Sequence, residues 1–143
     1  MTLKYSVSIN TARLNSIESA GAATPTLRVY KGTEPAIGAL ATASDMLVAI
    51  PLAADWLSAP SGSVPNLKVD KVGTWSATAA GGGVPGAATW FRIGASGADH
   101  TVVGSVQGSC GQGTGDMSFD NSTINSGQTV TVNTFSITAG NQA

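Results

Sequence analysis

Charged residues are scarce in this chain: Lys, Arg, Asp and Glu make up 10% of its 143 residues, against about 25% in a typical soluble domain. Their place is taken by 16 Ser, 16 Thr and 18 Gly. A surface with few ions is easily buried against a neighbouring protein, because few charges have to be desolvated. The same scarcity leaves few side chains for catalysis. The composition therefore favours a protein that assembles over an enzyme.

Further absences exclude other classes of protein. The single cysteine, Cys110, excludes an intramolecular disulfide framework. The seven Lys and Arg residues are scattered and the net charge is −1, so there is no basic stripe for nucleic acid. The N-terminus lacks the apolar segment of a secretion signal, and no apolar run approaches the ~20 residues that span a bilayer. We expect a protein made or assembled in a cytosol, with neither nucleic-acid nor membrane partners.

Hydrophobic spacing predicts one helix followed by strands. Over residues 6–20 and just before them, apolar side chains fall close to one helical face, and Gly21 follows where a helix commonly ends. The apolar stripe consists of Leu3, Val7, Leu14 and Ile17. From residue 26 the period changes to two, which is typical of strands. We expect strands at 26–30, 47–52, 64–72, 74–79, 89–93, 101–106, 116–119, 129–133 and 134–138.

This rhythm of short strands predicts an all-β fold. We expect an antiparallel β-sandwich, jelly-roll-like, with a short N-terminal helical segment. Residues 1–21 would form a helical arm and residues 22–143 a single β-sandwich domain. The expected core consists of Leu27, Val29, Val48, Ile50, Leu67, Val69, Trp90, Val102, Val132, Phe135 and Ile137.

The N-terminal stripe is too short to be a stable helix alone, so it must dock on something. It either covers an open side of its own sandwich or reaches a neighbouring subunit. We favour the neighbouring subunit, because terminal segments readily exchange between protomers in symmetric assemblies. The predicted partner-binding residues are therefore Leu3, Val7, Leu14 and Ile17.

Two motifs suggest chemistry but have simpler interpretations. Gly81, Gly83 and Gly86 match the spacing of a dinucleotide-binding loop, yet a strand and not a helix is expected next. Cys110 with residues 99–100, Asp and His, supplies the residue types of a covalent nucleophile system. However, Cys110 is expected in a glycine-rich surface loop at 108–115, and Asp and His are ordinary residues at a hairpin tip.

Polar and aromatic clusters are equally unspecific. Asp99, Asp116, Asp120 and Asn121 could gather around calcium, but their spacing matches no known calcium loop. The acids offer no support for the facing pair of a glycoside hydrolase. Tryptophans could form a sugar-stacking platform, although in alternating strands they are more often core or interface anchors; they are Trp56, Trp75 and Trp90. We predict no enzyme: no catalytic residue, no cofactor and no metal.

Several sequence segments resemble small virion proteins of tailed bacteriophages, the head decoration or capsid cement proteins. The first three are Leu-Lys-Tyr-Ser, Ala-Arg-Leu-x-x-Ile and Leu-Arg-Val-Tyr-x-Gly, at 3–6, 12–17 and 27–32. The later ones are Ala-Thr-Trp-Phe-Arg, Gly-Ser-Val and Thr-Phe-Ser-Ile-Thr-Ala-Gly-Asn, at 88–92, 104–106 and 134–141. The resemblance spans nearly the whole chain, and its motifs are structural.

The resemblance implies a structural virion protein that decorates and stabilises a phage capsid by bridging major capsid protein subunits. Its partners would be the major capsid protein and further copies of itself, as a dimer or trimer. It would be assembled in the host cytoplasm and lie on the outer surface of the capsid. The alternative is a receptor- or carbohydrate-binding β-sandwich module of a phage tail or particle surface. That alternative predicts exposed tryptophans, whereas the first predicts buried ones.

Overall fold

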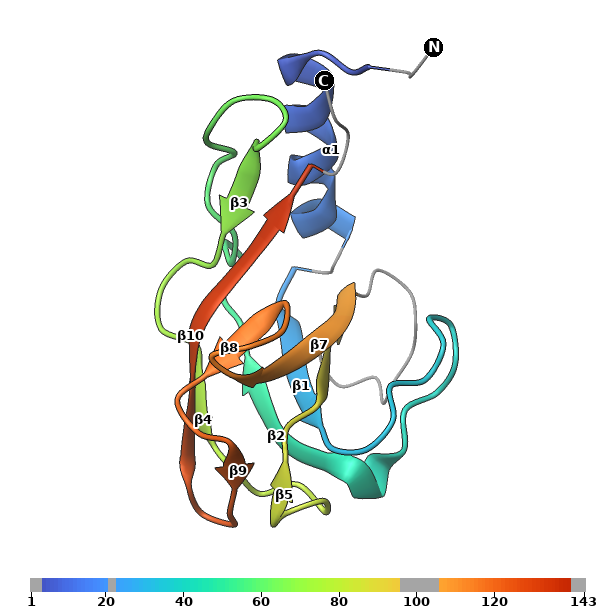
Figure 1. The fold of residues 1–143 in the computed structure, drawn as a ribbon, viewed down its shortest axis with the longest axis vertical. Coiled ribbons are helices and arrows are strands. Elements are labelled where there is room, and N and C mark those ends of the chain that lie inside the picture. The colour runs from blue at the N-terminus through green and yellow to red at the C-terminus, as the bar shows by residue number, and fades with distance from the viewer. Residues whose placement is uncertain (1–3, 21–22, 96–105, 140–143) are drawn as a thin grey trace.

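The computed structural model describes residues 4–20, 23–95 and 106–139. Within these ranges one α-helix, α1 (Val7–Ala20), lies at one end of a β-rich body (Figure 1). The strands are β1 (Pro25–Tyr30), β2 (Met46–Pro51), β3 (Lys68–Asp70), β4 (Ser76–Thr78), β5 (Gly86–Ala87), β6 (Trp90–Ala95), β7 (Val106–Gln112), β8 (Met117–Phe119), β9 (Thr123–Ile124) and β10 (Thr129–Thr138). One 3-10 turn, Ala43–Asp45, precedes β2. The predicted all-β fold with a short N-terminal helix is confirmed.

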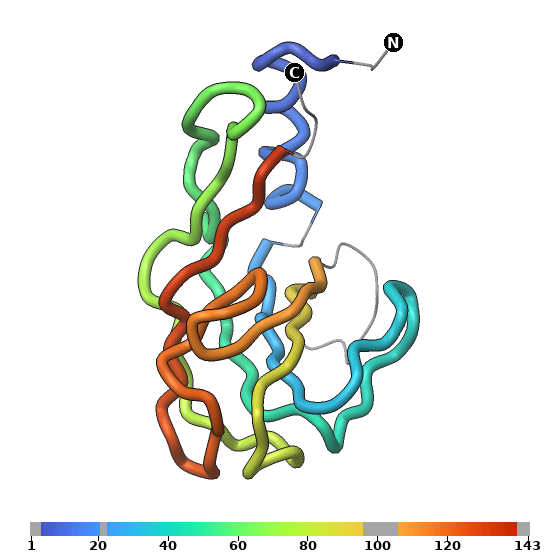
Figure 2. The backbone as a smooth tube through the Cα atoms, viewed as in Figure 1, coloured from blue at the N-terminus to red at the C-terminus, as the bar shows by residue number. Residues whose placement is uncertain are grey.

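Eight of these strands form one mixed sheet. Its order is β2-β1-β6-β7-β8-β10-β3, and β4 pairs with β10 as well. Every pair in it is antiparallel except β7 with β8, which is parallel. The sheet curls into a half-barrel, as the tube in Figure 2 shows. The two-layered jelly-roll sandwich is therefore not confirmed, because one continuous sheet provides both walls of the core.

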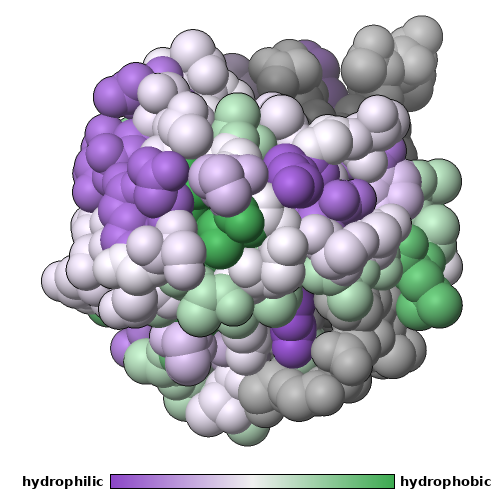
Figure 3. Space-filling view, turned by 90° about the horizontal axis from the view of Figure 1, so that it is seen from below, coloured by the Kyte–Doolittle hydropathy of each residue, from purple (hydrophilic) through white to green (hydrophobic). Residues whose placement is uncertain are grey.

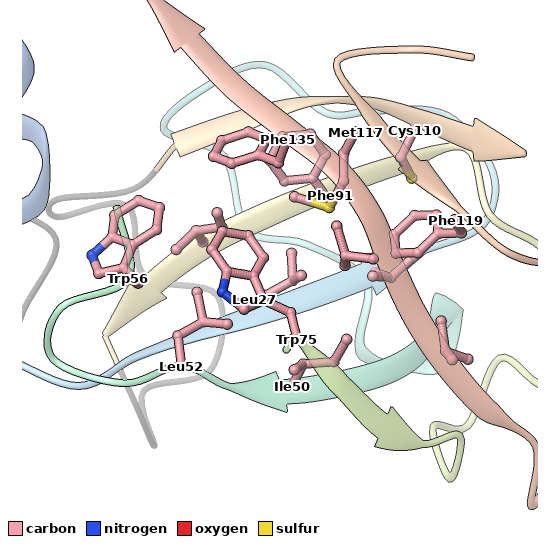
Figure 4. Packing of buried hydrophobic residues seen from close by; sticks show 14 of the residues in the cluster. Leu27, Ile50, Leu52, Trp56, Trp75, Phe91, Cys110, Met117, Phe119 and Phe135 are labelled. Carbon is pink, nitrogen blue, oxygen red and sulfur yellow. The ribbon is translucent and has the colours of Figure 1, made fainter. Parts of the chain in front are cut away.

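The core fills the inside of this curl. Four of its aromatic side chains, labelled in Figure 4, are Trp56, Trp75, Phe91 and Phe135. The ring of Phe135 contacts the other three, and Trp56 contacts Trp75, with ring centroids 5.6–6.5 Å apart. Such aromatic contacts bury large apolar areas. The predicted core residues that belong to this cluster are Leu27, Val29, Val48, Ile50, Leu67, Val69, Val132 and Phe135. Ile137 is half-buried against it, and Val102 lies outside the described residues.

Helix α1 closes one end of the core. Leu14 is only 2% exposed and belongs to the main cluster, and Ile17 packs against it. The carboxylate of Glu18 accepts a hydrogen bond of 2.9 Å from the backbone N–H of Leu57. Leu14 therefore covers its own domain and is not available to a neighbouring subunit. Val7, in contrast, is 52% exposed.

Other expectations are corrected by the strand boundaries. The segments 129–133 and 134–138 form one strand, β10, with a bulge between Val132 and Thr134. The glycine-rich stretch 108–115 is not a surface loop, because β7 extends through it to Gln112. β6 and β7 pair antiparallel. Of the strand expected at 101–106 only Val106 is among the described residues, and the expected hairpin tip lies outside them.

Candidate functional site

Cys110 lies on β7 with only 7% of its surface exposed. Burial raises the pKa of its thiol from 9.0 to about 12, and the negative charges of Glu34 and Asp116 act in the same direction. A thiol with so high a pKa stays protonated near neutrality, and the thiolate is the reactive form. The prediction that Cys110 lies in a surface loop is therefore wrong. Its burial keeps the thiol in the protonated, unreactive form near neutrality. The two other residues of the nucleophile hypothesis, Asp99 and His100, lie outside the described residues.

The glycine motif at 81–86 runs along the free edge of β2. The backbone N–H of Gly81 donates to Leu47 O at 3.1 Å, and that of Gly83 donates to Met46 O at 2.8 Å. A Cβ at Gly81 would lie 2.0 Å from Met46 O. The glycines therefore allow two backbones to approach closely, and strands β5 and β6 follow them instead of a phosphate-binding helix.

The acidic residues proposed for calcium hold backbone groups. Oδ2 of Asp116 accepts hydrogen bonds from the backbone N–H and the hydroxyl of Ser109, at 2.9 and 2.8 Å. Oδ1 of Asp120 accepts one from the N–H of Thr131 at 3.2 Å. Within the part of the chain that the structure describes, no group of three or more His, Cys, Asp or Glu residues is placed to hold a metal ion. Asp116 and Asp120 therefore fix the positions of neighbouring backbone segments through these hydrogen bonds.

All three tryptophans are buried, with 0%, 3% and 2% of Trp56, Trp75 and Trp90 exposed. Trp56 and Trp75 belong to the main core. Trp90 points to the opposite face of the sheet and stacks on Tyr30, with ring centroids 4.1 Å apart and planes within 8°. None of them offers a flat exposed ring, so they form no sugar-stacking platform.

Residues 31–45 cover this second face. Arg92, only 3% exposed, donates from Nε to the side-chain oxygen of Gln107 at 2.8 Å and from Nη1 to Ala39 O at 2.9 Å. Nε2 of Gln107 in turn donates to Oε1 of Glu34 at 2.8 Å. This network fastens the covering loop to β6 and β7. Sequence reasoning did not find it, because Arg92 and Glu34 are 58 positions apart.

The same loop carries the most exposed large apolar side chains among the described residues. Ile37 is 66% exposed and Leu40 is 72% exposed. Figure 3 shows a hydrophobic area on the side of the molecule from which this loop projects in Figure 1. Because the loop is held at Ala39, these side chains are presented on a fixed support. Such a patch is typical of a protein–protein contact.

Three adjoining open clefts lie along β10, and together we call them the β10 groove. The largest, about 500 Å³, is polar and contains an ion pair of 2.9 Å between Lys68 and Asp70. It is lined by Lys68, Asp70, Lys71, Gly115, Asp116, Asn133, Thr134, Phe135 and Ser136. The next, about 360 Å³, is lined by Phe91, Val106, Gln107, Asp116, Phe135, Ser136, Ile137 and Thr138. The third, about 310 Å³, is lined by Arg13, Leu14, Ser16, Ile17, Thr138 and Ala139.

Comparison with known proteins adds no family: no family model, no curated protein and no solved structure matches the chain. Among the described residues, α1 is too short to cross a membrane. Two surface features of the described residues offer contact area for a partner: the apolar loop tip with Ile37 and Leu40, and the β10 groove.

Proposed function

We propose that this protein is a structural component of a phage particle, which decorates the capsid and stabilises it by bridging major capsid protein subunits. The proposal rests on the resemblance of the sequence segments named above to head decoration proteins, which extends along nearly the whole chain. These motifs coincide with structural elements: 12–17 lies in α1, 27–30 in β1, 90–92 in β6 and 134–138 in β10. The proposal includes the finer fold assignment, a jelly-roll-like β-sandwich.

The physical character of the surface supports this role. Few charges have to be desolvated when the protein docks. The exposed side chains of Ile37 and Leu40, on the loop that Arg92 holds at Ala39, supply apolar contact area. Burying one such side chain contributes about 1.5–3 kcal/mol. Several weak contacts per copy, repeated over a shell, give strong overall attachment through avidity. The partners are the major capsid protein and further copies of this chain, as a dimer or trimer, on the outer capsid surface.

The test is the position of the protein in a purified particle. Electron microscopy of particles with and without the protein should show added density on the outer shell at sites between capsid subunits. Particles that lack it should release DNA at lower temperature. Density confined to a tail, or none at all, would contradict the proposal.

The alternative function, a receptor- or carbohydrate-binding module, rests on the polar cleft of about 500 Å³ beside β3. Its side chains Asn133, Thr134 and Ser136 offer the hydroxyl and amide groups that hydrogen-bond sugars. Without an exposed aromatic ring, binding would depend on these polar groups alone. Screening against host surface glycans, with Asn133→Ala as the binding-deficient variant, separates this function from capsid decoration.

A further inference from the structure

Strand β8 is shorter than the gap that it fills. It has three residues and lies between β7 and β10 in the sheet (Figure 1). Its ladder with β7 begins at the pair Cys110–Met117, although β7 already begins at Val106. Its ladder with β10 ends at Phe135–Met117, although β10 continues to Thr138. On the N-terminal side of Met117, Asp116 still bonds to Ser109 of β7. Past this pair the strand position between β7 and β10 is vacant among the described residues.

Every second residue at this end of β10 directs its backbone N–H and C=O groups into the vacant position. Ala139 N donates to Leu67 O at 2.9 Å, so the odd-numbered residues at this end of β10 bond toward β3. In an antiparallel pair the residues that bond to a given neighbour alternate. The N–H and C=O groups of Ser136 and Thr138 therefore point away from β3, into the vacant position.

The backbone of β7 faces it from the other side. Cys110 N donates to Thr89 O at 3.0 Å, which places the even-numbered residues of β7 on the β6 side. Gln107 and Ser109 face the opposite way. Ser109 is already satisfied, since its N–H donates to Asp116 Oδ2 and its C=O accepts from Asp116 N. The N–H and C=O of Gln107 remain directed at the vacant position.

The space between these edges is a cleft of about 360 Å³ with an apolar floor. Phe91 and Phe135, 1% and 4% exposed, form its base, and half-buried Val106 and Ile137 flank it. Asp116 is the only charged residue that lines this cleft, while Arg13 lines the adjoining cleft beyond Thr138. The position therefore combines backbone groups on two sides, an apolar base and opposite charges at its two ends.

We propose that this vacant position is a strand-addition site for an extended segment of another polypeptide, which continues the line of β8 between β7 and β10. The segment has about three residues in the site, because Ser109 already bonds to Asp116 and Val106–Gly108 leaves about 10 Å at ~3.3 Å per residue. Alternate side chains are apolar and contact the base. A basic residue lies at the Asp116 end and an acidic residue at the Arg13 end. This inference rests on the proposed function for its source, a major capsid protein subunit.

Peptide binding to the isolated full-length protein tests the site directly. Because β7 and β10 run antiparallel to each other, a strand between them is parallel to one in either direction, so two probes are needed. These are the peptides Lys-Val-Thr-Val-Thr-Glu and Glu-Val-Thr-Val-Thr-Lys, each with blocked ends. At least one should bind saturably and shift the backbone amide NMR signals of Gln107, Ser136 and Thr138. If neither shifts those signals, the proposal is wrong.

Proline variants identify the mode of binding. Ser136→Pro and Thr138→Pro each remove an N–H that faces the vacant position and break no bond to β3, so binding should weaken about tenfold. Ala49→Pro is the matched control. Leu52 N donates to Pro25 O at 2.9 Å, which places the even-numbered residues of β2 toward β1, so the N–H of Ala49 points away from β1. That variant should fold and bind like the parent. N-methylation of the central peptide residues should also abolish binding.

The outcomes separate this inference from the proposed function. One outcome is that both proline variants unfold like the parent and still bind the peptide with unchanged affinity. In that case the peptide does not add as a strand, and the inference fails. If the protein is found on capsids but no peptide binds, only the strand-addition site is wrong. If a peptide binds as expected but the protein is absent from capsids, the site stands and its source is another polypeptide.

Discussion

Replacing Leu14 by alanine tests whether α1 is part of the folded core. The side chain of Leu14 is 2% exposed and belongs to the same buried cluster as the sheet residues. Leu→Ala changes at such sites cost about 2–5 kcal/mol, because transfer free energy is lost and a cavity is left. We expect a loss of about 3 kcal/mol for Leu14→Ala, since one side of the helix remains near solvent and allows some relaxation.

Urea unfolding followed by tryptophan fluorescence measures this loss. Trp56 is fully buried and precedes Leu57, whose N–H donates to Glu18 of the helix, so its emission reports on this end of the core. With an m-value of about 2 kcal/mol/M, a loss of about 3 kcal/mol lowers the midpoint by about 1.5 M. The control is Val7→Ala, whose side chain is 52% exposed; its stability should change by less than about 0.5 kcal/mol.

Equal midpoints for Leu14→Ala and the parent would refute this reasoning. The helix would then be detached from the sheet in solution, and the interpretation of residues 1–21 as an arm for a neighbouring subunit would regain its basis. A second variant, deletion of residues 1–20, extends the test. It should expose the core around Leu57 and lower the midpoint at least as much as Leu14→Ala does.

Four further predictions follow from individual residues. Gly81→Ala should destabilise by about 2 kcal/mol or more, because its Cβ would lie 2.0 Å from a backbone oxygen of β2, whereas Gly82→Ala should be mild, with its nearest atom at 3.6 Å; thermal melts compare the two. Cys110 should resist iodoacetamide at pH 8 in the native state and react in urea, as measured by mass. Because folding raises the pKa of the Cys110 thiol from 9.0 to about 12, its contribution to stability is complete below pH 9 and is lost as the pH rises toward 12; a midpoint independent of pH over this window would contradict it. The double variant Ile37→Ser, Leu40→Ser should melt like the parent, since both side chains are exposed, but co-sediment less with particles that lack the protein; undiminished co-sedimentation would remove the loop tip from the interface.

Local patterns were sufficient for most of the secondary structure. Alternation over 26–30 and 47–52 predicted β1 and β2, because side chains of a strand point to opposite faces in turn. The same alternation is present in β6, where Phe91 and Ile93 belong to the main core and Trp90 lies on the other face. These features depend on neighbouring residues only, so a single sequence contains them.

The glycine-rich segment 108–115 shows where such patterns fail. A glycine-rich composition fits a loop and also fits a strand that passes close to another backbone segment. The decisive feature is the turn after β7, where Gly113 and Gly115 adopt φ of +68° and +84° and return the chain beside Ser109. β8 then runs parallel to β7 after only four connecting residues. Parallel neighbours usually need a much longer connection, so this pairing was not predictable from the sequence.

By itself, the sequence determined the all-β class, the N-terminal helix and most of the strands, because hydrophobic period and glycine positions act locally. Only the tertiary structure decided that the strands form one curled sheet, that Leu14 faces its own core and that Arg92 is buried under residues 31–45. Among the residues that the structure describes, it also left the position past Asp116, between β7 and β10, without a strand. Each of these depends on pairing between distant segments, and the free energy of such pairing comes from contacts that no local window of sequence contains.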